Sequence, residues 1–273
     1  MYVTKADGRL EKFDFYKIVR TCKRSGVPQN EAERIAGEIE RQAYDGIPTR
    51  DLLNIILTHL EKRNAGYASR YDLKGAIMRL GPSGFAFEKF IAELFRIMGY
   101  STQTNVIVQG RCVPHEVDVV AEKDCKRYMI ECKYRNLPGV YIGIQKALYV
   151  WARFEDIRDG SDAGKCIKFD VPYLVCNTKF SDDVIQYASC RGLKVMGWSY
   201  PEGASISDIL NEKKIYPVTV LRSIDTRMIG LLADANMMFC SDLSEEKLAG
   251  LGISKKRVQD IMDEVRGVLK DMV

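Results

Sequence analysis

A short apolar run that contains two charged residues constrains this chain more than any other sequence feature. The run Tyr128–Tyr134 has the composition of a buried strand, yet it includes Glu131 and Lys133. Because side chains of a strand alternate between its two faces, both charges project to the same side. Burying them costs free energy unless a partner compensates them. Asp118 lies in the preceding apolar segment. Pairing of the two segments would therefore bring two carboxylates and an ammonium to one sheet edge.

This set of groups matches the needs of phosphodiester hydrolysis. A carboxylate pair chelates Mg²⁺ or Mn²⁺, because hard cations select oxygen ligands. A fixed positive group orients the attacking water and stabilises the charge that grows on the phosphate. We expect Asp118 and Glu131 to be the metal ligands and Lys133 to act on the water. Glu88, in a helix that starts near Phe87, is expected to add a further acid at this edge.

The composition describes an ordinary soluble globular protein with room for more than one domain. Of its 273 residues, 46% are hydrophobic and 29% are charged. No stretch approaches the roughly 20 apolar residues that span a bilayer, and the N-terminus lacks the layout of a secretory signal. The net charge of +4 is mildly basic, which permits a nucleic-acid partner without requiring one.

The cysteines indicate a reducing compartment rather than a metal or redox site. There are eight of them, scattered along the chain without a CxxC pair. This spacing argues against a zinc ribbon and against a thioredoxin-type site. Most lie in apolar runs and are expected to be reduced, buried thiols, so we expect a cytoplasmic protein.

The first segment, residues 1–82, is expected to form a hairpin followed by helices. An Asp-Gly pair at Asp7 and Gly8 separates two strand-like runs, which is typical of a tight β-hairpin. A second helix is expected to begin at Thr49 as its N-cap. The stretch 80–84 is interpreted as a linker. Helical spacing for the first of these helices is seen in Ala32, Ile35, Ala36, Ile39 and Ala43.

The second segment, residues 85–205, alternates helices with strands and predicts a three-layer α/β domain. A first helix is expected to stop at Gly99, and others are expected around 141–154 and from Ser181 onward. That first helix follows from the apolar spacing of Phe87, Phe90, Ile91, Leu94 and Met98. Strands are expected near 104–109, 116–121, 128–134, 171–176 and 194–198.

The third segment, residues 216–273, is predicted to be all-helical. Its last helix is capped by Ser254 and carries an apolar stripe that extends to Met272. The glycine turn of Leu248–Ser254, followed by three basic residues, resembles a helix-hairpin-helix element, in which backbone amides contact a phosphate. A helical pack that closes the domain or forms a dimer is the alternative. The fold class is therefore multi-domain α/β.

The central segment resembles the PD-(D/E)xK restriction-endonuclease-like superfamily, and within it the Mrr-like branch. The likeness covers about residues 85–200, including the strand-to-helix turn Asn177–Ser181. It implies a metal-dependent DNA endonuclease with Asp118 and Glu131 as metal ligands and Lys133 as the group that activates water. It further implies that Gln145 organises the site and that Glu88 is an auxiliary acid. The motif residues in chain order are Glu88, Asp118, Glu131, Lys133 and Gln145.

Two positions near the motif are less diagnostic. Val117 precedes Asp118 where the family pattern has proline, which weakens the signature little because the chemistry needs the acid. His115 is either a phosphate or supporting contact, or a loop histidine whose hydrogen bonds are satisfied locally.

Residues 1–80 resemble the ATP-cone, a regulatory nucleotide-binding module of ribonucleotide reductases and their repressor. The match includes the charged hairpin, the phrase Tyr44–Thr49 and the run Tyr67–Tyr71. The chain has no room for a reductase barrel, and it lacks the cysteine pairs of the repressor. The resemblance implies contacts to ATP or dATP from Lys5, Glu11, Asp14, Lys17 and Thr49, with Arg79 as a further candidate.

The function expected from these features is a Mg²⁺- or Mn²⁺-dependent DNA endonuclease whose activity or assembly responds to ATP or dATP. The expected partners are DNA, an adenine nucleotide and further copies of the chain in a homo-oligomer, without a membrane. One alternative is a non-catalytic DNA-binding protein that responds to nucleotide. Another is a structure-selective repair nuclease or resolvase, which shares the chemistry but differs in substrate.

Overall fold

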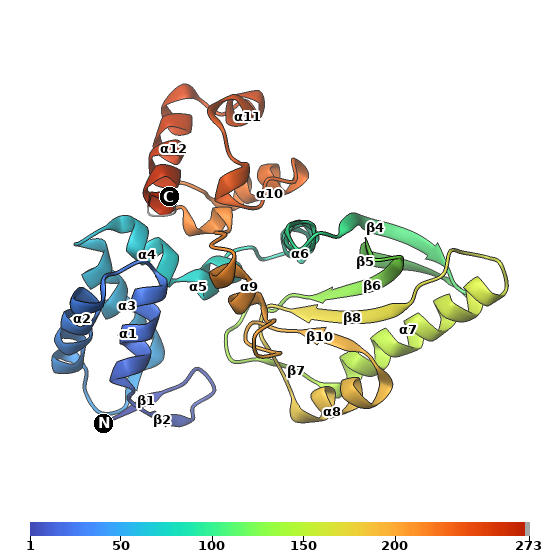
Figure 1. Cartoon of the computed structure of the whole chain (residues 1–273), viewed down its shortest axis with the longest axis horizontal. Helices are drawn as coiled ribbons and strands as arrows, with labels where there is room; N and C mark the ends of the chain where they lie inside the picture. The colour runs from blue at the N-terminus through green and yellow to red at the C-terminus, as the bar shows by residue number, and fades with distance from the viewer. Residues whose placement is uncertain (271–273) are drawn as a thin grey trace. The chain divides into compact units, whose positions relative to one another are not determined.

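The computed structural model describes residues 1–270, and the chain divides into two compact units (Figure 1). The first unit combines Met1–Ile77 with Lys213–Met228 and the described residues from Phe239 onward. The second unit combines Met78–Glu212 with Ile229–Met238. The three-domain division expected from the sequence stays a prediction, because one compact unit can hold more than one domain.

The first unit begins with a small sheet and a group of helices. Its three strands have the order β2-β1-β3, with β1 antiparallel to β2 and parallel to β3. The predicted hairpin is confirmed, and Gly8 has a φ of 82°, a conformation that favours glycine. The elements are β1 (Tyr2–Thr4), β2 (Leu10–Lys12), α1 (Phe15–Arg24), α2 (Gln29–Gln42), β3 (Ile47–Pro48), α3 (Thr49–Glu61), α4 (Ala65–Tyr71) and α5 (Leu73–Met78).

The helices of this unit enclose one apolar core. Asp14 caps α1, because its carboxylate accepts the backbone N–H of Lys17 at 2.9 Å. The helix expected at Thr49 does begin there, but Thr49 is not its side-chain cap; its Oγ1 donates to the carbonyl of Thr4 instead. The core consists of buried residues that include Ile18, Cys22, Ile35, Ile39, Ile56 and Leu60.

The C-terminal helices complete the first unit. Buried Arg70 donates from Nε to the carbonyl of Ser25 at 2.7 Å and from Nη1 to that of Val268 at 2.8 Å. Thr219 donates to the carbonyl of Ala76 at 2.7 Å. The elements are η1 (Val218–Val220), α10 (Thr226–Asp234, with residues in both units), η2 (Cys240–Asp242), α11 (Glu245–Gly250) and α12 (Lys255–Leu269). Met272, which the sequence placed on the stripe of α12, lies outside the described residues.

The second unit is built on a five-stranded mixed sheet of order β10-β8-β6-β5-β4. Strands β4, β5 and β6 are antiparallel, whereas β6, β8 and β10 are parallel. A separate two-stranded sheet pairs β7 with β9. The elements are α6 (Phe85–Ile97), β4 (Ser101–Gln109), β5 (Pro114–Lys123), β6 (Lys126–Lys133), β7 (Tyr141–Ile142), α7 (Ile144–Asp162), β8 (Val171–Cys176), β9 (Lys179–Phe180), α8 (Asp182–Arg191), β10 (Lys194–Met196) and α9 (Ile206–Glu212).

Helices cover both faces of this sheet. Helix α6 lies on one face and α7 and α8 on the other (Figure 1). On the α6 face, Phe87 contacts Tyr134, the residue after β6, with ring centroids 5.5 Å apart. On the other face, Val150 and Phe154 of α7 share a core with Leu174 of β8. Burial on both faces explains why β8 is apolar throughout its centre.

These observations confirm the predicted fold class, a multi-domain α/β protein with a helical C-terminal segment. Helix α7 is longer than expected, because it continues to Asp162 through a mostly polar stretch in which Ile157 is the one apolar side chain. The short pair β7 and β9 was not anticipated. Within residues 1–270, no helix is both long and apolar enough to cross a bilayer.

Candidate active site

Strands β5 and β6 separate at the two carboxylates singled out in the sequence. Their paired register ends at Val119 and Ile130, one residue before Asp118 and one before Glu131. Beyond this point the carboxylate of Asp118 replaces the lost strand contact, since its Oδ2 accepts the backbone N–H of Cys132 at 2.7 Å. The two acids therefore lie in a fork between the strands.

Glu131 is the most buried charged group of this fork, with its side chain 5% exposed. Its Oε1 accepts a hydrogen bond from Lys133 Nζ at 2.5 Å, and its Oε2 is ion-paired with Arg153 Nη1. Each oxygen of the carboxylate thus has its own cation, which compensates the cost of burial. The side chain of Lys133 is 25% exposed, so this ammonium reaches solvent from the fork.

Asp118 is held in a setting that disfavours its charge. Burial, then the negative charge of Glu131, raise the pKa of Asp118 to about 7, and Glu88 adds to this effect. The pKa of Glu88 is also raised, chiefly by burial and further by Glu116 and Glu131. The structure therefore brings Glu88, Asp118, Glu131 and Lys133 close enough to interact electrically.

A distortion of β4 lies opposite Asp118. Asn105 interrupts the pairing of β4 with β5 and has a φ of 55°, in the left-handed region. Its side-chain amide donates to Glu88 Oε2 at 3.3 Å and to Glu116 Oε1 at 3.2 Å. Asn tolerates this backbone conformation better than most residues, which explains why it can occupy the position. Asn105 thus links two further acids at the edge of the fork.

Within residues 1–270, neither Gln145 nor His115 is hydrogen-bonded to the acids of the fork. Gln145 is exposed in the first turn of α7 and makes no hydrogen bond to Asp118, Glu131 or Lys133 in the part of the chain that is described. Its role as an organiser stays a prediction. His115 Nε2 lies 2.8 Å from Asp156 Oδ2, and that carboxylate also accepts the N–H groups of Cys112 and Val113. His115 is therefore satisfied locally.

The residues of the fork fit a divalent cation such as Mg²⁺. No group of three or more His, Cys, Asp and Glu side chains in residues 1–270 is arranged as a complete metal cage. Mg²⁺ does not need one, because it uses one or two carboxylates and completes its shell with water and substrate phosphates. Burial, and after it the negative charge of Glu131, raise the pKa of Asp118, and a bound cation would offset both effects. Asp118 and Glu131 are the residues that would hold it.

The residues that resemble an ATP-cone site gather on the hairpin and the first turn of α1. Glu11 lies between two lysines, 3.3 Å from Lys5 Nζ and 3.1 Å from Lys17 Nζ. Lys17 and then Lys5 lower the pKa of Glu11. Asp14 has a lowered pKa because it accepts the backbone N–H of Lys17, and it pairs with Arg20 at 3.2 Å.

Thr49 lies beside these groups through its bond to β1, whereas Arg79 belongs to the second unit. The assignment of nucleotide contacts to these residues stays a prediction.

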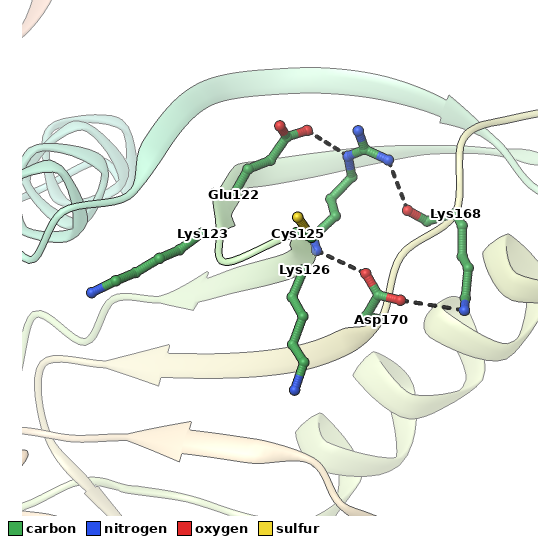
Figure 2. Close-up of a pocket in the computed structure, with 7 residues that line it drawn as sticks. Glu122, Lys123, Cys125, Lys126, Lys168 and Asp170 are labelled. Carbon is green, nitrogen blue, oxygen red and sulfur yellow. Dashed lines mark hydrogen bonds and ion pairs between the residues drawn. The ribbon is translucent and has the colours of Figure 1, made fainter.

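A polar pocket lies at the opposite end of β5 and β6 from the fork (Figure 2). Its charges are largely paired with one another: Arg127 Nε donates to Glu122 at 2.6 Å, and Lys168 Nζ lies 3.4 Å from Asp170. Lys123 extends away from the other residues and donates to the carbonyl of Met98. We assign no chemistry to this pocket. It has a volume of about 520 Å³ and is lined by Glu122, Lys123, Cys125, Lys126, Arg127, Lys168 and Asp170.

Arg153 and Asn105 are members of the site that the sequence reasoning missed. Arg153 is 22 residues from Glu131, on a different element. One signal could have found it: Val150, Arg153 and Ile157 have the i, i+3, i+7 spacing of a buried helix face, and arginine is rarely buried without a partner. Asn105 had no comparable signal, because its role depends on a local backbone distortion.

Three stretches of the chain match known family models. Residues 1–73 match the ATP cone domain, residues 81–146 match the model described as restriction endonuclease, and residues 216–269 match AF1548-like, C-terminal. An uncharacterized protein of Archaeoglobus fulgidus is 44% identical over 182 residues, which are 66% of this chain and 99% of the relative. The crystal structure of a protein of unknown function, AF1548, is 42% identical with a TM-score of 0.62, over 69% of this chain and 99% of that chain. The chain belongs to the AF1548-like family.

A second uncharacterized protein of the same organism is 54% identical to this AF1548-like protein over 39 residues, 14% of the chain and 83% of the relative. The family models confirm the predicted fusion of an ATP-cone to a Mrr-like restriction-endonuclease-like domain. The names of the relatives state no activity. The chemistry of this AF1548-like protein is therefore argued from its own residues.

Proposed function

We propose that this AF1548-like protein is a metal-dependent DNA endonuclease whose activity or assembly is regulated by ATP or dATP bound to its N-terminal domain. The observation that carries the proposal is the fork between β5 and β6, where Asp118, Glu131 and Lys133 converge. Its position inside a restriction-endonuclease-like domain supports DNA as the substrate. The ATP cone match supports adenine nucleotide as the regulatory ligand.

In the proposed reaction, Asp118 and Glu131 hold Mg²⁺ or Mn²⁺, which when bound supplies charge stabilisation and an activated water. Lys133 reaches solvent from the fork, so its ammonium can orient the attacking water or donate to a phosphate oxygen. Glu88 and Gln145 are proposed as supporting groups at the same edge. Binding of nucleotide to one assembly more tightly than to another would shift the balance between them.

Cleavage assays on the full chain test the catalytic part of this proposal. We expect wild-type protein to cut DNA with Mg²⁺ or Mn²⁺, and Asp118→Asn or Lys133→Ala to lower the rate by about 100-fold or more while DNA binding persists. The matched controls are Asp124→Asn, in the turn between β5 and β6, and Lys126→Ala, at the start of β6. Assays across duplex, branched and single-stranded DNA distinguish a general endonuclease from a structure-selective repair nuclease or resolvase.

A different result favours the non-catalytic alternative. If every DNA form survives with either metal, with and without ATP and dATP, while DNA binding is measurable, then the protein is a nucleotide-responsive DNA-binding protein.

Calorimetry with ATP and dATP tests the nucleotide site. Lys17→Ala removes one of the two ammonium groups that flank Glu11, so we expect nucleotide binding to be lost. Lys12→Ala is the control, because Lys12 lies on β2 of the same hairpin. Equal binding by wild type and Lys17→Ala would remove the assignment of this site. Sedimentation with each nucleotide tests the proposed homo-oligomer, and identical profiles would reject a nucleotide-dependent assembly.

A further inference from the structure

A buried arginine on α7 joins the two strands at the point where they separate. Arg153 donates from Nη1 to Glu131 Oε2 on β6 and from Nη2 to the carbonyl of Glu116 on β5. The paired register of these strands has already ended at Val119 and Ile130. The guanidinium therefore connects β5 and β6 where their own hydrogen bonds are missing.

The surroundings of Arg153 hold this connection in one geometry. Its side chain is 10% exposed, and Tyr149, one helical turn earlier, covers the guanidinium with its ring centroid 5.3 Å from Cζ. A guanidinium presents its donors in one rigid plane, which suits simultaneous bonds to a carboxylate and a carbonyl. The Nε atom is buried and has no hydrogen-bond partner among the described residues. The hydrogen bonds to Glu131 and to the Glu116 carbonyl are thus the ones that hold the guanidinium in place.

The pairing also divides the two oxygens of Glu131 between two roles. Oε2 is taken by Arg153, whereas Oε1 is bound by Lys133, the cation that reaches solvent. Oε1 is therefore the oxygen whose cationic partner is the more exposed of the two. A carboxylate fixed in this way acts through a single oxygen, with little freedom to rotate.

We propose that Arg153 is a positioning residue of the nuclease centre, which fixes Glu131 as a ligand through one oxygen and lowers the negative charge of the fork. This inference rests on the proposed function. Arg153 contacts neither DNA nor metal in this proposal and acts only through Glu131 and the Glu116 carbonyl. Two effects on the metal oppose each other: the positive charge weakens cation binding, whereas the fixed geometry speeds the reaction of the bound state.

This opposition supplies the test. In the full chain, Arg153→Met removes the positive charge and the two hydrogen-bond donors but keeps an unbranched apolar stem. Mn²⁺ titration calorimetry without DNA is expected to give three- to tenfold tighter binding than wild type, because Glu131 loses a compensating cation. Cleavage of DNA at saturating Mn²⁺ is expected to be at least tenfold slower. Arg153→Lys keeps the positive charge but lacks the planar guanidinium donors. It is expected to have wild-type Mn²⁺ affinity but only part of the wild-type cleavage rate.

Arg158→Met is the matched control, since Arg158 lies on the same helix with its side chain 45% exposed. Arg153→Gln serves if Arg153→Met does not fold, because its amide is an uncharged hydrogen-bond donor. The proposal is overturned if the uncharged variant has wild-type Mn²⁺ affinity, or if affinity and rate fall together in step with the loss of folded protein.

The two proposals fail separately. Wild-type protein that cuts no DNA would remove the nuclease proposal, while Mn²⁺ calorimetry would still judge the effect of Arg153 on Glu131. Conversely, if wild-type protein cuts DNA and the Arg153 variants have its Mn²⁺ affinity and cleavage rate, the nuclease proposal stands and this one is removed.

Discussion

Asp118 lies on β5, and Asp156 of α7 contacts His115 of the same strand. The environments of the two aspartates shift their pKa values in opposite directions. Burial and the charge of Glu131 raise the pKa of Asp118 to about 7. The hydrogen bond from His115, with the backbone N–H groups of the adjacent turn, lowers the pKa of Asp156 to about 2. The first carboxylate is crowded by other acids, whereas the second is surrounded by donors. We therefore interpret Asp118 as a candidate metal ligand and Asp156 as a carboxylate that stabilises the adjacent turn.

Asp156→Asn is expected to destabilise the second unit in a pH-dependent way. The folded-state pKa of about 2 lies below the ordinary aspartate value of 3.8, so the contribution of Asp156 to stability is present above pH 4 and is lost as the pH falls through 2. Thermal unfolding should show a clear loss in Tm for the variant at pH 6 and about half of that loss at pH 3. Asp159→Asn, an exposed neighbour on α7, is the control. Equal losses at both pH values would contradict this account.

At the scale of elements, the close approach of α4 and α12 depends on a glycine. A Cβ placed on Gly66 would collide with the backbone carbonyl of Gly267, whereas a Cβ on Gly267 would meet nothing within 4 Å. The contact between the two helices therefore requires glycine at position 66 but leaves room for a larger residue at position 267. The bond from Arg70 to the Val268 carbonyl holds the same pair of helices together.

Gly66→Ala is expected to lower the free energy of unfolding of the first unit by about 1–3 kcal/mol, because the obstructing atom is backbone and cannot rotate away. Gly267→Ala is the matched control and is expected to be neutral or to stabilise by about 0.5–1 kcal/mol through its higher helix propensity. Denaturant unfolding of both variants measures the difference. A neutral Gly66→Ala would show that α4 and α12 separate easily.

At the scale of the whole molecule, the chain leaves its first unit after Ile77 and returns to it at Lys213. The returning helices are held by the buried hydrogen bond from Thr219 to Ala76 and by the ion pair of Arg222 with Glu61. Apart from Ile229–Met238, the described C-terminal segment is therefore part of the unit that contains the ATP cone, although it is separated from it in sequence. A ligand that stabilises the cone should stabilise these helices too.

Native-state hydrogen exchange tests this expectation. If the first unit opens cooperatively, ATP at 100 times its Kd should raise the protection of amides in both α2 and α12 by about 2.7 kcal/mol. Lys17→Ala should abolish both increases. Protection that rises in α2 alone would mean that the C-terminal helices open independently of the cone.

Much of the fold followed from the sequence, since periodicity and turn residues act locally. Asp7 and Gly8 predicted the hairpin, and the apolar spacing that begins at Phe87 predicted α6. The end of α7 was missed because its last turns are polar apart from Ile157, so the apolar spacing fades there. For the candidate site, the two-residue spacing of Glu131 and Lys133 and the acid at Asp118 were visible, because a strand fixes which side chains share a face. Arg153 was not visible, because its partner lies on another element.

The sequence by itself determined the domain families, the element order and the chemical types available at the sheet edge, because these depend on near neighbours along the chain. Tertiary structure alone decided that β5 and β6 part at Asp118, that Arg153 bridges the opening, and that the C-terminal helices join the ATP-cone unit. Each of these depends on groups far apart in sequence, whose contacts arise only when helices and strands pack against one another.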